Sequence, residues 1–178
     1  MILAVALLLV FAFASIRVVR EYERVVAFRL GRLRGPLGPG LVFMFPFLDK
    51  MVRVDLRVVT LTIPPQEVIT KDNVTVKVNA VAYYRVVDAA RSIVQVENYE
   101  LATSQIAQTT LRAVLGKHDL DEMLAEREKL NDDIRAILDS QTDAWGIKVA
   151  NVEIKHVDIN ETMVRAIARQ AEAERVRR

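Results

Sequence analysis

Residues 54–86, which read VDLRVVTLTIPPQEVITKDNVTVKVNAVAYYRV, decide the fold of this chain because they predict two long strands joined by a short turn. Apolar and polar residues alternate through 51–63, and the two prolines at 64–65 are predicted to end that strand. Residues 66–70 and the second strand, at 74–86, are predicted to flank a short polar turn at 71–73. The pattern predicts an antiparallel, half-buried pair within a larger curved sheet. The residues predicted to share one face of the first strand are Val52, Val54, Leu56 and Val58.

Beyond this pair the apolar period changes from that of a strand to that of a helix. Residues 99–115 predict one helix, and Asp119 with Glu122 predicts a capping box at the start of the next. An amphipathic helix is predicted at 125–144. Residues 147–159 alternate again and predict a strand that returns to the sheet. Strands combined with helices in this way indicate an α+β fold.

Before the strand pair, residues 22–30 predict a strand and the Gly/Pro-rich residues 31–40 predict a loop. The apolar run LVFMFPFL at 41–48 has two interpretations. It is either a buried strand edge that Pro46 ends, or an aromatic loop that enters the bilayer interface. In the second interpretation the inserting side chains are Phe43, Phe45 and Phe47.

The chain begins with sixteen uncharged residues, MILAVALLLVFAFASI. As a helix they reach about 24 Å, and extension through Val18 and Val19 gives about 28 Å, close to the hydrocarbon core of about 30 Å. The absence of Pro and Gly favours a straight span over a re-entrant insertion. Cleavage after Ala14 as a signal peptide is the alternative, although the basic n-region of such peptides is missing. The membrane-inserting residues predicted here are Ile2, Leu3, Leu7, Leu8, Leu9, Phe11 and Phe13.

Basic residues are concentrated next to this apolar segment. Between residues 17 and 57, nine Lys or Arg side chains stand against four Asp or Glu, whereas the rest of the chain is acidic on balance. Basic residues beside a membrane are attracted to anionic headgroups, and the positive-inside rule places the domain on the cytoplasmic side of a prokaryotic cell membrane. A solvated charged surface explains Arg32 and Arg34 equally well.

The composition gives no support to catalysis, metal binding or nucleic-acid binding. The chain has no Cys and two His, and it contains no phosphate-binding loop, nucleophile elbow or HExxH motif. His118 is expected in an exposed connection between helices, and His156 is expected at the edge of the core. The basic excess lies beside the apolar segment, which argues against nucleic acid as a partner. We therefore expect no enzyme activity and no cofactor.

The last residues predict a further helix that Asn160 caps. Its end, ARQAEAERVRR at 168–178, has the composition of a long exposed helix or coiled coil. Nothing there resembles a helix stop, so the chain is expected to be the front portion of a longer protein. The residues expected to contact another copy are Met163, Ile167, Arg169 and Glu172.

Several blocks occur in a fixed order that resembles one protein family. They are the initial apolar segment, GPLGPGLVFMFPFLD at 35–49, the strand pair at 54–86, ENYELATSQIAQTTLRAVLGKHDLDEMLAEREKLN at 97–131, WGIKVANVEIKHVDI at 145–159, and AIARQAEAERVRR at 166–178. From about Arg20 to Arg178 the chain resembles the stomatin/slipin branch of the band 7 (stomatin–prohibitin–flotillin) family.

Together, the apolar start and this resemblance imply four parts. They are a membrane anchor at 1–19, a mostly β subdomain at 20–95 with a membrane-proximal loop at 35–49, a subdomain of helices and a returning strand at 96–158, and the start of a long helix at 159–178. The resemblance also implies a non-enzymatic scaffold that assembles with copies of itself into a ring or cage. Such an assembly organises a membrane microdomain around partner membrane proteins. The alternatives are a regulatory subunit of an NfeD-type membrane serine protease and, secondly, an enzyme that acts on lipid or peptide.

Overall fold

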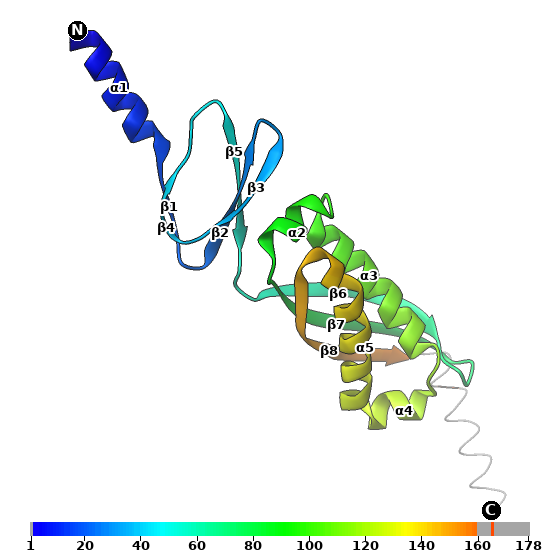
Figure 1. Ribbon diagram of the computed structural model, residues 1–178. Helices are drawn as coiled ribbons and strands as arrows, with labels where there is room; N and C mark the ends of the chain where they lie inside the picture. The colour runs from blue at the N-terminus through cyan, green and yellow to red at the C-terminus, as the bar shows by residue number, and fades with distance from the viewer. Residues whose placement is uncertain (1, 160–164, 166–178) are drawn as a thin grey trace, which may run out of the picture. The chain divides into compact units, whose positions relative to one another are not determined.

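The computed structural model of the chain describes residues 2–159 and residue 165 (Figure 1). The described residues fall into two compact units, and the chain passes between them several times. Unit 1 draws on Met1–Val58, Arg85–Tyr99 and Asp143–Lys148, and unit 2 draws on Val59–Tyr84, Glu100–Thr142 and Val149–Arg178.

Unit 1 contains one long apolar helix and two small antiparallel sheets. One is a ribbon of β1 with β4, and the other has the strand order β3-β2-β5. The elements of unit 1 are α1 (Ile2–Ser15), β1 (Ile16–Val19), β2 (Glu23–Arg29), β3 (Arg32–Leu37), β4 (Gly40–Phe43), β5 (Asp49–Asp55), α2 (Ala89–Val94) and the short 3-10 helix η1 (Asp143–Trp145).

The central strand β2 is buried on both faces, which explains its run of apolar residues. Val25 and Ala27 pack with Val42 and Met44, whereas Val26 packs in a second cluster with residues of β5 and of the α2 region. A strand covered on both sides reads as a continuous apolar run rather than an alternating one. The strand predicted at 22–30 is confirmed.

The loop predicted at 31–40 is wrong for most of its length, because β3 occupies Arg32–Leu37. The glycines that suggested a loop serve local backbone needs instead. Gly35 has φ of 109° and lies at the bulge where the pairing with β2 shifts register. Pro36 is tolerated because β3 is an edge strand, where a missing N–H costs no bond within the sheet.

Unit 2 holds most of a three-stranded sheet, in the order β6-β7-β8, together with three helices. Its elements are β6 (Val59–Ile69), β7 (Thr75–Val86), α3 (Tyr99–Leu115), α4 (Leu120–Ala125), α5 (Arg127–Thr142) and β8 (Ile147–Ile159). This sheet takes strands from both of the sequence ranges, 20–95 and 96–158, that the family resemblance assigns to separate subdomains.

The region predicted as one strand at 51–63 is divided between β5 and β6, and the two prolines do not end β6. The pairing of β6 with β7 shifts between Ile63 and Gln66, so the prolines occupy an irregularity on an edge strand. The side-chain amide of Gln66 donates to the carbonyl oxygen of Pro64 at 3.1 Å. Val58, predicted to share a face with buried Val54, is exposed.

The helical half follows its prediction closely. The bounds predicted for α3 and β8 are confirmed, and the capping box of α4 is present at Asp119 and Glu122. Helix α5 occupies most of the predicted 125–144 and buries Leu130, Ile134 and Leu138. Polar side chains of α5 also accept hydrogen bonds from the backbone of β8. Asp139 accepts from the N–H of Val149, and Asn131 accepts from the N–H of Ile154, at 3.0 Å each.

The antiparallel sheets and helices confirm the predicted α+β class. The cap at Asn160, the helix or coiled coil predicted at 159–178, and the contact residues Met163, Ile167, Arg169 and Glu172 lie outside the described residues, apart from Ile159 at the end of β8 and the isolated Arg165.

Candidate membrane-contact surface

Helix α1 exposes apolar side chains around its circumference. From Val5 to Phe13 every Val, Leu and Phe is exposed, including the predicted Leu7, Leu8, Leu9, Phe11 and Phe13. Ile2 and Leu3 lie in the helix, but their side chains are outside the described part of the structure. Among the helices formed by residues 2–159, none combines the length and apolar composition needed to cross a membrane.

The predicted extension of the helix through Val18 and Val19 is wrong, because Ile16–Val19 form β1. Two hydrogen bonds mark the change: Ser15 Oγ donates to the Phe11 carbonyl at 2.8 Å, and the Met44 N–H donates to the Ser15 carbonyl at 2.8 Å. The second bond begins the pairing with β4. The chain leaves the helix because β4 supplies partners for its backbone.

The β1–β4 ribbon has one buried face and one exposed apolar face. Ile16 lies opposite Phe43, and Val18 lies opposite Leu41. Directly opposed residues share a face, so these four apolar side chains form one surface. Val18 is 65 %, Leu41 78 % and Phe43 61 % exposed, whereas Val19 and Val42 on the other face are buried.

The loop after β4 continues this apolar surface. Phe47 is 99 % exposed and has φ of 77°, a backbone conformation that costs a non-glycine residue about 1–2 kcal/mol. Leu30, in the β2–β3 turn, is also exposed at positive φ, and its N–H donates to the Leu48 carbonyl at 3.1 Å. Two neighbouring turns therefore each hold an apolar side chain outward on a strained backbone.

Asp49 fixes the conformation of this loop. Its side chain is fully buried, and its two oxygens accept from Arg29 Nε at 2.8 Å and Arg29 Nη2 at 3.0 Å. The Phe45 N–H donates to the same carboxylate at 3.0 Å. The Arg29 hydrogen bonds, followed by that of Phe45, lower the pKa of Asp49 to about 2. The Arg29 guanidinium also lies 5.1 Å from the centre of the Phe45 ring, within cation–π range.

Helix α1 and the loop meet at a small cleft. Ala14 and Arg17 line it together with Met44, Phe45, Pro46, Asp49 and Met51. The structure thus places the end of α1, at Ala14, beside Phe45, one of the three predicted membrane-inserting phenylalanines. Of the two interpretations of 41–48, the buried strand edge is confirmed for Val42 and Met44, whereas the phenylalanines are exposed and their insertion into a bilayer stays a prediction.

Sequence reasoning placed Ile16 and Val18 in the apolar helix and Leu41 in the run at 41–48, but it missed the ribbon, the exposed Leu30, and Asp49 as the residue that holds the loop. The apolar residues of 16–19 and 41–43 were the available signal for the ribbon, although they do not alternate regularly with polar residues. Asp49 carried no such signal, because an Asp after an apolar run is also typical of an ordinary turn.

The two histidines do not form a site. His118 is half-buried rather than fully exposed, and its Nδ1 lies 2.9 Å from Glu122 Oε2. The prediction that His156 packs at the core edge is wrong, because it is exposed. Within the described part of the chain, no group of three or more His, Asp or Glu side chains is arranged to hold a metal ion.

Comparison with known proteins identifies the family. The model of the SPFH domain / Band 7 family matches residues 17–178. An uncharacterized protein of Archaeoglobus fulgidus is 59 % identical over 94 % of this chain and 68 % of its own length. A stomatin homologue of Pyrococcus horikoshii is 57 % identical over 96 % of this chain and 64 % of its own length. Mouse stomatin is 48 % identical over 90 % of this chain, which spans 57 % of the mouse protein. The chain therefore belongs to the SPFH domain / band 7 family and is similar to the stomatins within it.

Proposed function

We propose that this protein is a membrane-associated scaffold that attaches through the exposed apolar surface of unit 1 and assembles there with further copies of itself. The observation that carries the proposal is the succession of α1, the β1–β4 ribbon and the 45–48 loop, all of which expose large apolar side chains. Exposed apolar surface of this extent marks an interaction site rather than an ordinary protein surface.

The energetics favour a lipid surface for the loop and ribbon. Burying one Leu or Phe side chain contributes about 1.5–3 kcal/mol, and 1.4 kcal/mol changes a partition constant tenfold. Phe47 is almost fully available for such burial, and Leu41 and Phe43 are mostly available. An amphipathic element with basic neighbours is the usual form of an interfacial anchor.

Self-assembly follows from attachment. Copies held on one surface diffuse in two dimensions, which raises their effective concentration. Family membership supports the scaffold, and the remainder of a longer chain would extend the contacts, since this chain spans about two thirds or less of its stomatin relatives. Regulation of an NfeD-type membrane protease remains a prediction of the same resemblance, and so does the absence of enzyme activity.

Flotation with vesicles of phosphatidylcholine tests the attachment. We expect the chain to float with the vesicles and the double variant Phe43→Ser/Phe47→Ser to bind at least tenfold more weakly for each residue changed. The matched control is Val94→Ser/Leu124→Ser, which removes exposed apolar side chains from α2 and α4. Equal binding by the two double variants would rule out the loop and ribbon as the contact surface.

Assembly is tested by the mass of the full chain in mild detergent and after reconstitution into vesicles with crosslinking. We expect masses of several copies in both conditions. A monodisperse monomer in detergent and no crosslinked species on vesicles would contradict the scaffold. The enzyme alternative predicts that His118→Ala or His156→Ala abolishes an activity, whereas the scaffold predicts unchanged assembly in both.

A further inference from the structure

The two ends of the strand pair β2–β5 carry very different arrangements of charge. Glu23 lies opposite Asp55 at one end, and Arg29 lies opposite Asp49 at the other. The nine basic residues between 17 and 57 divide between these ends. Arg20, Arg24, Arg53 and Arg57 belong to the first, with Glu21, Glu23 and Asp55, whereas Arg17, Arg29, Arg32, Arg34 and Lys50 belong to the second, with Asp49 alone.

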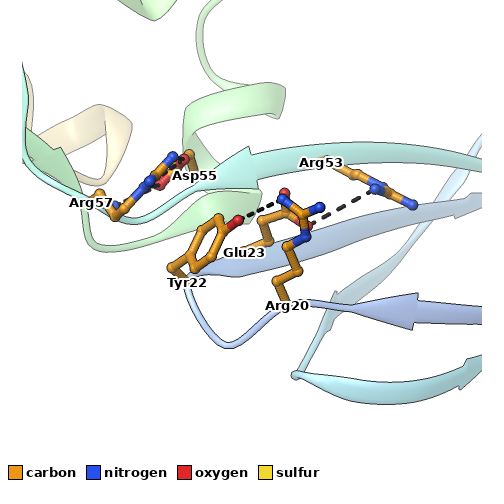
Figure 2. Close-up of polar contacts among 6 residues, drawn as sticks. All are labelled: Arg20, Tyr22, Glu23, Arg53, Asp55 and Arg57. Atoms are coloured by element: carbon orange, nitrogen blue, oxygen red, sulfur yellow. Dashed lines mark hydrogen bonds and ion pairs between the residues drawn. The ribbon is translucent and has the colours of Figure 1, made fainter.

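At the first end each arginine has a partner within the chain, and Figure 2 shows the contacts of Arg20, Arg53 and Arg57. Arg57 forms a salt bridge with Asp55 at 2.6 Å and lies 4.3 Å from the centre of the Tyr22 ring, while Arg53 approaches Glu23 at 4.0 Å. Arg20 donates to the Tyr22 hydroxyl at 2.6 Å. Arg24 donates to the backbone carbonyls of residues 21 and 23. This end carries four arginines against three carboxylates, and each arginine contacts a group of the same end, although Glu23 Oε2 is buried without a hydrogen bond.

At the second end the single carboxylate, Asp49, is paired with one arginine, Arg29. Both oxygens of Asp49 accept from Arg29, and the side chain has no exposed surface. In the part of the chain that the structure describes, neither Arg32 nor Arg34 forms a salt bridge, and both are exposed. Asp49 therefore anchors the loop without neutralising the arginines around it.

The register brings Arg32 onto the same face as Arg29 and Asp49. Arg32 lies directly opposite Arg29, which itself lies opposite Asp49, so the three side chains share a face of the sheet. Arg34 is the additional residue of the bulge, two residues after Arg32 on the same edge strand, and it is exposed like Arg32. Like charges directly opposite one another in a sheet are destabilising, so folding alone does not favour this cluster.

We propose that Arg32 and Arg34 bind the phosphate of anionic lipid headgroups, whose negative charge is not offset by a choline cation, so that unit 1 prefers anionic over zwitterionic membranes. Guanidinium groups bind phosphate oxygens in a bidentate manner. The inference rests on the proposed membrane contact, because the apolar Phe47 and Leu30 lie in the adjoining turns, joined by the Leu30–Leu48 hydrogen bond. A lipid supplies both an apolar surface and a phosphate there, whereas a soluble phosphate supplies only the second.

Vesicles of phosphatidylcholine, with and without phosphatidylglycerol, test this preference. We expect tighter binding to the anionic vesicles and a decrease in binding as salt is raised. Each Lys or Arg near an anionic surface contributes about fivefold to binding. The variant Arg32→Gln/Arg34→Gln should therefore bind anionic vesicles about 25-fold more weakly and bind pure phosphatidylcholine unchanged.

The matched control is Arg53→Gln/Arg57→Gln, which removes the same charge from the internally paired end. A strand the length of β2 spans about 20 Å, more than the Debye length of about 8 Å at physiological salt. We expect its binding to anionic vesicles to change less than threefold. Thermal unfolding of each variant confirms that both remain folded.

The outcomes separate the two proposals. Binding to neutral and anionic vesicles with equal affinity, or equal loss in the two double variants, overturns the headgroup site and leaves the membrane contact standing. Failure to bind any vesicle overturns both. Inorganic phosphate, added at constant ionic strength with chloride as the reference anion, should not release the bound protein. Specific release would show that the arginines take free phosphate instead.

Discussion

Helix α5 in unit 2 and the loop end of unit 1 use apolar side chains in opposite ways. In α5, Leu130, Ile134 and Leu138 repeat at helical spacing and are at most 1 % exposed. In unit 1, Leu41, Phe43 and Phe47 have strand or turn backbone and are mostly exposed. The comparison teaches that apolar content alone does not mark a core. A periodic stripe with a polar opposite face predicts burial. An apolar run without that period, beside basic residues, can leave its large side chains exposed for contact with a membrane.

The largest effect is expected for the core side of this comparison. Leu138→Ala removes a side chain with no exposed surface and should lower the free energy of unfolding by about 2–5 kcal/mol, through lost burial and a residual cavity. Denaturant unfolding measures the change. The folded fraction should bind phosphatidylcholine vesicles as the unmodified chain does, because Leu138 contributes nothing to the contact surface. A loss under 1 kcal/mol would show that α5 is less tightly packed than its burial indicates.

Phe47→Gly should separate stability from attachment. Glycine adopts the φ of 77° without the cost that a larger side chain incurs, which offsets its greater entropy loss on folding. We expect the free energy of unfolding to stay constant or to rise by up to about 1 kcal/mol, while vesicle binding falls at least tenfold. Denaturant unfolding and flotation are measured on the same preparation.

A loss of stability above 1 kcal/mol in Phe47→Gly would contradict this division and assign Phe47 a structural role. The matched variant is Leu30→Gly, at the other exposed position with positive φ. Leu30→Gly should also leave the free energy of unfolding constant or slightly raised and weaken vesicle binding. The loss of binding should be smaller than in Phe47→Gly, because Leu buries less area than Phe.

The fold was predictable wherever one local signal acted alone. The bounds of α3 and β8 follow from periodicity between clear end signals, and the Asp119–Glu122 capping box follows from spacing. Strand β3 was missed because Gly35 and Pro36 usually indicate a loop, and sequence does not show that a bulge and an edge position accommodate them. Strand residues were predicted on both sides of the two prolines, but their continuity within β6 was missed for the same reason.

The contact surface was predictable only as a list of apolar residues. The phenylalanines at 43, 45 and 47 stand out in the sequence, and the structure exposes all three. The end of α1 at Ser15 could not be predicted, because it depends on pairing with β4, a segment more than twenty residues later. The role of Asp49 depends on Arg29, twenty residues earlier, so no local pattern reveals it.

The smallest expected effect concerns this ion pair. The folded pKa of Asp49, about 2, lies below the ordinary value of 3.8. A carboxyl group with a lowered folded pKa stabilises the folded state fully above its unfolded pKa, and this stabilisation is lost as the pH falls through the folded pKa. Between about pH 4 and pH 2 the unmodified chain should therefore lose the stability that ionised Asp49 contributes. The Asp49→Asn variant lacks this contribution at every pH, because its amide does not titrate there.

The test is the difference between the two unfolding curves as a function of pH, because Asp55 and Glu122 also have lowered pKa values and titrate in both proteins. We expect the difference to be constant above about pH 4 and to shrink toward pH 2. Asp49→Asn also removes the carboxylate that pairs with the Arg29 guanidinium, so this end of unit 1 gains net positive charge. Binding to anionic vesicles at neutral pH should therefore stay constant or increase, even if the 45–48 loop loosens. A pH-independent difference in stability would mean that the Arg29–Asp49 contact is not an ion pair, and the loop would then depend on the Phe45 N–H bond and the backbone turn alone.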